Sequence, residues 1–172
     1  MQTLSQARFT RTELLVATAV VVTVAVIAVP GLLRARMSGN EAAAIASLRA
    51  IADAELAYAS VCGHNYYAPA LSTLGVPPQG GSQAFLESGL AVAAPQRGGY
   101  RYTLAAGEGA AAGPSDCNGT ATTTAYYATA VPARFGGTGG RSFAVNTART
   151  IWQAPAAAAP VEPFAAPATP IQ

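Results

Sequence analysis

Side chains able to do acid–base, nucleophilic or metal chemistry are few in this sequence of 172 residues, which has one histidine, two cysteines and eight acidic residues. Cys62 and His64 stand two residues apart, but no third residue that would orient the imidazole beside a thiol is evident. Zinc sites usually need four ligands, and a single histidine with two cysteines is poor material for one. We therefore predict no enzymatic activity, no catalytic residue, no metal and no cofactor.

The two cysteines, Cys62 and Cys117, have a second chemistry open to them. If this part of the chain lies outside the cytoplasm, a disulfide is the natural interpretation. It would close a loop of about 55 residues and stabilise the fold by roughly 4 kcal/mol in the chain-entropy model. The alternative is two unpaired buried thiols.

Glu13 has the most unusual surroundings of the acidic residues, because it precedes a long stretch without any charge, Leu14–Leu33. As a helix, about 20 residues at about 1.5 Å each span about 30 Å, the thickness of the hydrocarbon core of a bilayer. Thr10 and Glu13 form the T-x-x-E pattern of a capping box, which predicts a helix start. Pro30 and Gly31 are predicted to kink or loosen the helix near the end of this stretch.

Helical sequence continues over residues 34–60, where one stripe is apolar. Its members recur at three- and four-residue steps: Ile45, Leu48, Ile51 or Ala52, Leu56 and Ala59. Arg49 and Asp53 are spaced to pair on the other side of the helix. This amphipathic half needs a partner surface, which the rest of the chain must supply.

Loops and short strands are predicted over residues 61–152. Alternating or β-branched stretches at 100–104, 122–131 and 141–152 indicate three or four antiparallel strands, one face of which would lie on the amphipathic half of the helix. The fold class is therefore α+β. Residues 153–172 are rich in proline and alanine and are predicted to be disordered.

The overall charge excludes little by itself. The net charge is +2, and charged residues make up 10% of the chain. So small and scattered an excess makes nucleic acid an unlikely partner.

Residues 9–58 closely resemble the N-terminal segment of type IV pilins and type II secretion pseudopilins. The resemblance is carried by FTRTELL, the apolar stretch and GLLRARMSGNEAAAIASLRAI. If Phe9 is the first residue of the mature chain, Glu13 is the fifth and Pro30 the twenty-second, as in this family. Residues 1–8 would then be a leader.

The resemblance implies a mechanism. The precursor would sit in a bacterial inner membrane, with a cytoplasmic N-terminus and a periplasmic C-terminal domain. A prepilin peptidase would cut between Arg8 and Phe9 and methylate Phe9. At an inner-membrane assembly platform, subunits would leave the bilayer and pack their helices, residues 9–33, into a homo- or hetero-polymeric filament. Glu13 would pair there with the amino group of Phe9 on a neighbouring subunit.

The chain departs from the family pattern near the cleavage site. Arg8 stands where the family usually has glycine, and Arg11 and Thr12 occupy positions that are usually apolar. These departures favour an alternative, an uncleaved membrane-tethered periplasmic binding module. A minor pilin of the DNA-uptake or adhesin type is another, and the sequence does not separate a pilus from a secretion pseudopilus.

Overall fold

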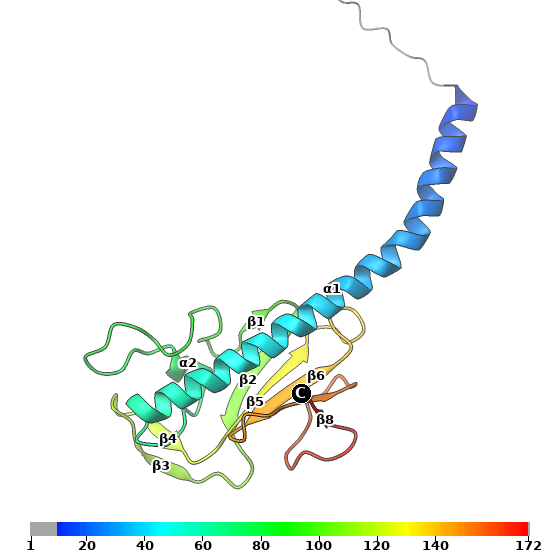
Figure 1. Ribbon diagram of the computed structural model, residues 1–172. Helices are drawn as coiled ribbons and strands as arrows, with labels where there is room; N and C mark the ends of the chain where they lie inside the picture. The colour runs from blue at the N-terminus through cyan, green and yellow to red at the C-terminus, as the bar shows by residue number, and fades with distance from the viewer. Residues whose placement is uncertain (1–9, 172) are drawn as a thin grey trace, which may run out of the picture. The chain divides into compact units, whose positions relative to one another are not determined.

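The computed structural model describes residues 10–171, which form two helices and eight strands (Figure 1). The leader, residues 1–8, and both partners of the predicted cleavage, Arg8 and Phe9, lie outside the described residues. The elements are α1 (Arg11–Val61), α2 (Leu71–Leu74), β1 (Gln96–Arg97), β2 (Tyr100–Ala106), β3 (Ala112–Ser115), β4 (Ala121–Thr123), β5 (Tyr126–Pro132), β6 (Ser142–Asn146), β7 (Ile151–Ala154) and β8 (Thr169–Pro170).

The chain divides into two compact units, Met1–Arg36 and Met37–Gln172, called the N-terminal and C-terminal units below. The predicted long helix is confirmed, since α1 runs over 51 residues and belongs to both units. Within the N-terminal unit the described chain after Thr10 is helix, and its side chains are exposed.

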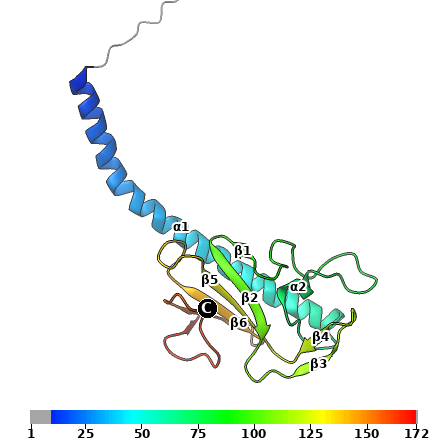
Figure 2. The same ribbon diagram turned by 180° about the vertical axis from the view of Figure 1, so that it is seen from behind.

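The C-terminal unit is an antiparallel sheet with the second half of α1 on one face, which confirms the α+β class. The main sheet has the strand order β1-β2-β5-β6-β7-β8. Figure 1 shows this part of α1 in front of β2, β5 and β6, and Figure 2 shows the same strands in front of the helix. Between helix and sheet lies one apolar core, to which α1 contributes Leu48 and Ile51, and the sheet Tyr102, Phe143 and Val145.

The prediction of three or four strands is wrong, because the main sheet has six strands and β3 and β4 form a second sheet. The two outermost strands, β1 and β8, have two residues each. Two residues cannot show an alternating pattern, so sequence periodicity misses such strands. In β3, glycine and proline weaken the strand signal further.

The disordered tail is not confirmed for residues 153–171. Ile151–Ala154 forms β7, and Thr169–Pro170 returns as β8 and pairs with it. The tail lies beside β6 in both views, coloured orange to red (Figures 1 and 2). Its composition is that of a disordered segment, but the sheet offers it aromatic and hydrogen-bonding partners that composition does not reveal.

The amphipathic stripe of α1 is largely right, with two exceptions. Leu48 and Ile51 are fully buried, but Leu56 is about half exposed, and its neighbour Glu55 takes the buried position instead. Asp53 pairs with Arg149 from the β6–β7 connection rather than with Arg49. Partners from distant parts of the chain thus override the spacing along the helix.

Candidate functional site

The apolar stretch of α1 presents its large side chains outward within the N-terminal unit. The valines, leucines and isoleucine between residues 14 and 33 are each at least half exposed, and Ile27 reaches 75%. Single exposed apolar residues are common on protein surfaces, but a continuous apolar surface around a helix indicates contact with a membrane or with another protein. This segment is therefore the strongest candidate for an interaction surface.

A capping box begins this helix, as predicted. The backbone N–H of Thr10 donates to Glu13 Oε2 at 3.0 Å, and the backbone N–H of Glu13 donates to Thr10 Oγ1 at 3.2 Å. The Thr10 hydroxyl adds a third bond to the same carboxylate oxygen, at 3.0 Å. These bonds satisfy donors that the first turn of a helix leaves without partners, and they fix the Glu13 carboxylate at the helix entrance.

The polar side chains inside the apolar stretch are satisfied by the helix itself. The hydroxyls of Thr18 and Thr23 donate to the carbonyl oxygens of Leu14 and Ala19, at 2.7 and 2.8 Å. These threonines therefore do not need water, which suits a helix in lipid or in an apolar bundle. α1 continues through Pro30, so the predicted kink there and at Gly31 remains a prediction.

Charges flank the stretch and do not interrupt it. Arg11 and Glu13 precede it, while Arg34 and Arg36 follow it. Among residues 10–171, α1 is the one helix that is long and apolar enough to cross a membrane by length and composition. A signal sequence near the N-terminus meets the same criteria, so a membrane span is compatible with this helix and not demonstrated by it.

Just after the arginines that follow the apolar stretch, two α1 residues of the C-terminal unit form hydrogen bonds with the loop between β5 and β6. Glu41 accepts hydrogen bonds from the backbone N–H of Gly140 at 2.8 Å and from Arg141 Nε and Nη2 at 2.9 and 2.6 Å. Asn40 Nδ2 donates to the carbonyl oxygen of Thr138 at 2.9 Å. The sequence does not predict these contacts, because their partners lie about 100 residues apart and no local spacing indicates them.

A second missed carboxyl, Glu55, is fully buried. Its Oε2 accepts a hydrogen bond from the backbone N–H of Ala68 at 2.9 Å, which ties the segment after α1 to the helix. Within the described chain, its Oε1 and the hydroxyl of Tyr126 are buried without a hydrogen-bond partner. Burial raises the pKa of the Glu55 carboxyl to about 8, so this group is largely neutral at pH 7.

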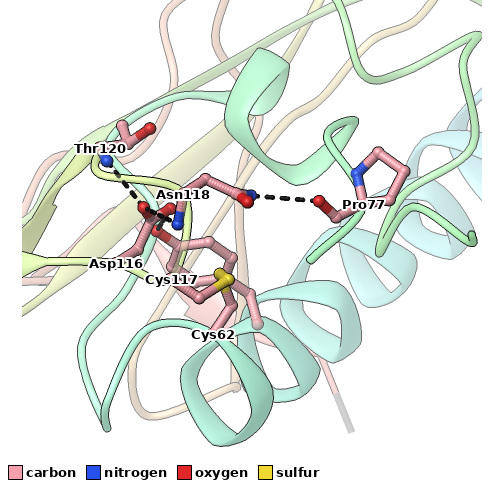
Figure 3. Close-up of a disulfide and its surroundings, with 7 residues drawn as sticks. Cys62, Pro77, Asp116, Cys117, Asn118 and Thr120 are labelled. Carbon is pink, nitrogen blue, oxygen red and sulfur yellow. Dashed lines mark hydrogen bonds between the residues drawn. A yellow bond between two sulfur atoms is a disulfide. The ribbon is translucent and has the colours of Figure 1, made fainter. Parts of the chain in front are cut away.

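The predicted disulfide is present between Cys62, just past the end of α1, and Cys117, in the turn between β3 and β4 (Figure 3). Asp116 Oδ1 orders this turn by accepting the backbone N–H groups of Asn118 and Thr120, at 2.9 and 2.7 Å. Its Oδ2 accepts the Tyr58 hydroxyl at 2.8 Å, so the turn is fixed to α1 by a hydrogen bond as well as by the sulfur bridge.

A thiol–imidazole pair is not formed, since Cys62 is engaged in the disulfide and His64 is exposed. Over residues 10–171 no group of three or more His, Cys, Asp or Glu side chains is close enough to hold a metal ion. Pairs of titratable residues that the structure brings together, such as Glu41 with Arg141, Asp53 with Arg149 and Asp116 with Tyr58, join segments of the fold to one another.

Comparisons of the chain with protein-family models, with curated proteins and with solved structures found no match in any of the three.

Proposed function

We propose that this chain is a structural subunit of the pilin class, without enzymatic activity, that polymerises through the apolar first half of α1. The observation that carries the proposal is the outward-facing apolar stretch of residues 14–33 with one carboxylate, Glu13, held at its entrance. Whether the filament is a type IV pilus or a type II secretion pseudopilus is left open.

The physical argument begins with the cost of exposing this helix to water. A lipid bilayer or a bundle of identical helices removes that cost, since both surround the apolar side chains with apolar groups. A bundle adds close packing between the helices. The same segment can therefore hold the subunit in the membrane first and hold it in a polymer later.

Glu13 gives the bundle its register in this proposal. A carboxylate among apolar helices is unfavourable unless a positive group neutralises it. Both hydrogen bonds that reach this carboxylate come from Thr10 and end on Oε2, so Oε1 has no bond among the described residues. The amino group of Phe9, freed by removal of the leader, is the countercharge that a neighbouring subunit would supply there.

The disulfide supports a periplasmic C-terminal unit. Disulfides persist in oxidising compartments, which include the bacterial periplasm and the cell exterior. With Cys62 and Cys117 outside the inner membrane, the short N-terminal segment before α1 would lie in the cytoplasm.

A second candidate is a periplasmic module that remains tethered to the membrane and never polymerises. Arg11 favours it, because this exposed charge lies in the first turn of α1 and would need its own partner inside a filament. In a tether, the same arginine would simply lie among lipid headgroups.

Two substitutions of Glu13 test the proposed function. Glu13→Gln keeps an oxygen that can accept the Thr10 hydrogen bonds and removes only the charge, whereas Glu13→Ala removes both. If the charge sets subunit register, both variants enter the membrane at the level of the unchanged protein, and both fail to appear in the sheared filament fraction.

The control is Thr10→Ala, which weakens the cap and keeps the charge. It should leave filament yield nearly unchanged. Normal filament yield from Glu13→Gln would contradict the assembly role of the charge, and absence of the unchanged protein from every filament fraction would favour the tether.

A further inference from the structure

The middle of the main sheet, at β5 and β6, is largely buried on both faces, although only one face meets α1. Neighbouring residues of a strand point to opposite faces, and Phe143 lies in the core under α1, so Ala144 faces away from the helix. Ala144 is nevertheless fully buried, and Thr129, its partner on β5, is only 7% exposed. Something other than α1 therefore covers this outer face.

The cover is the segment Pro155–Ile171, called the tail segment below. Phe164 stacks on Trp152, with ring centroids 5.1 Å apart and planes 20° apart. Its ring is also 6.3 Å from that of Tyr127, whose hydroxyl donates to the carbonyl oxygen of Pro160. The aromatic side chains of β5 and β7 thus receive the proline-rich middle of the tail segment.

Polar contacts fix the register of the tail segment. Glu162 accepts a hydrogen bond from Asn146 Nδ2 at 2.6 Å and another from the backbone N–H of Glu108 at 2.9 Å. The Ser142 hydroxyl donates to the carbonyl oxygen of Ala156 at 2.6 Å. Near its end the tail segment pairs with the free edge of β7 as β8.

We propose that the outer face of β5, β6 and β7 is a docking site for an extended proline-rich segment, anchored by residues equivalent to Pro160, Glu162 and Phe164. The chain's own tail fills this site in cis, and the same tail of a second copy can fill it in trans. Aromatic side chains that receive prolines, hydrogen bonds at fixed positions and pairing with a strand edge are the means by which proteins bind such peptides.

The tail segment is held by the sheet more than by its own packing. It surrounds a partly open pocket of about 380 Å³ lined mainly by alanine and proline, from Ala154 to Ala168. Because this pocket is open to solvent, the side chains of the tail segment do not form a packed interior of their own. Contacts with the sheet therefore supply most of what keeps the tail segment in place, and these contacts do not require that both parts belong to one chain.

The covalent connection of each tail segment to its own sheet is the main obstacle to the exchange of tails between copies. A short connection gives the chain's own tail an effective concentration on the order of millimolar. A tail from another molecule competes poorly with it in dilute solution and well where copies are crowded side by side. This inference does not depend on polymerisation through α1.

The test uses the full chain in detergent and a synthetic peptide of residues 155–172. Trp152 is the only tryptophan, so its emission reports directly on Phe164 stacking. In the double variant Phe164→Ala, Glu162→Gln the cis tail is weakened, and the peptide should bind and shift the Trp152 emission. Binding to the unchanged chain should be about 100-fold weaker, because its intact cis tail holds the site at a high effective concentration, whereas the weakened tail of the double variant leaves the site open.

A control peptide with alanine in place of Phe164 should not produce the shift. Absence of peptide binding to a double variant that keeps its far-ultraviolet circular dichroism would overturn the proposal. So would equal binding to the variant and the unchanged chain, since the site would then lie elsewhere.

A second measurement covers the case in which the double variant does not fold. A protease site inserted between the exposed residues Ala157 and Ala158 allows the tail to be cut with all its contacts intact. The released fragment should separate on dilution and restore the original Trp152 emission when it is added back. A fragment that separates and then does not rebind would contradict the docking site.

Discussion

The buried carboxyl of Glu55 gives the C-terminal unit a stability that depends on pH. Burial raises its pKa from 4.5 to about 8, against the opposing effect of the hydrogen bond from the backbone N–H of Ala68. In the unfolded chain the carboxyl is in water and titrates near its ordinary value. Between these two pKa values the folded state holds a proton that the unfolded state releases, so the free energy of unfolding falls as the pH rises.

The size of this effect follows from the two pKa values. One pKa unit corresponds to about 1.4 kcal/mol, so the interval from 4.5 to about 8 corresponds to a loss of about 5 kcal/mol. The loss is complete once the pH exceeds the folded-state pKa. Total stabilities of single domains are about 5–15 kcal/mol, so a change of this size is large. For a domain of this length it lowers the melting temperature by about 10 °C or more.

Glu55→Gln removes the titration and keeps the shape of the side chain. Its amide oxygen can still accept the hydrogen bond from Ala68, as the protonated acid does. The free energy of unfolding, measured by urea titration in detergent at pH 5.0 and 8.5, should differ by several kcal/mol in the unchanged protein. In Glu55→Gln this difference should be smaller by about 3–5 kcal/mol.

An exposed glutamate provides the matched control. Glu108→Gln makes the same chemical change at an exposed position and should leave the pH dependence unchanged. If the free energy of unfolding changes between pH 5.0 and 8.5 as much in Glu55→Gln as in the unchanged protein, the buried carboxyl does not cause the pH dependence, and the reasoning is wrong.

Two further perturbations act on the contacts that join α1 to the rest of the C-terminal unit. Replacing Cys62 and Cys117 by serine opens a loop with a sequence separation of 55 residues. By the chain-entropy model, the free energy of unfolding should fall by about 4 kcal/mol. An unchanged urea midpoint under non-reducing conditions would contradict this. Glu41→Ala leaves the backbone N–H of Gly140 and the Arg141 guanidinium without their acceptor and should cost about 1–3 kcal/mol. Glu41→Gln keeps one acceptor oxygen and should cost less than Glu41→Ala. An equal cost for both would contradict this expectation, because the remaining oxygen would then contribute nothing.

Local sequence patterns predict the parts of this fold that depend on near neighbours. Thr10 and Glu13 lie three residues apart and form the expected cap. The apolar positions of α1 predict that it is long, and the spacing of Leu48 and Ile51 predicts its buried face. The two cysteines could be paired because the chain has no others.

Contacts between distant residues could not be predicted in the same way. Glu41 and Arg141 are 100 residues apart, and no spacing connects them. Glu55 belongs to a residue type that is mostly exposed, yet it occupies a buried position beside the half-exposed Leu56. The tail has the composition of a disordered segment, and only the aromatic face of the sheet explains why it is held.

The candidate site also has a part that the local sequence predicts and a part that it does not. The sequence alone identifies the apolar stretch and Glu13, because chain order and composition define them. What covers this helix depends on other molecules, which neither the sequence nor the structure of a single chain contains.

The intact mass of the protein in the sheared filament fraction of its own host tests the central claim most directly. The account predicts a chain that begins at Phe9, carries one added methyl group and retains the disulfide. A chain that begins at Met1 and occurs solely as a single copy, in the membrane or in solution, would contradict it.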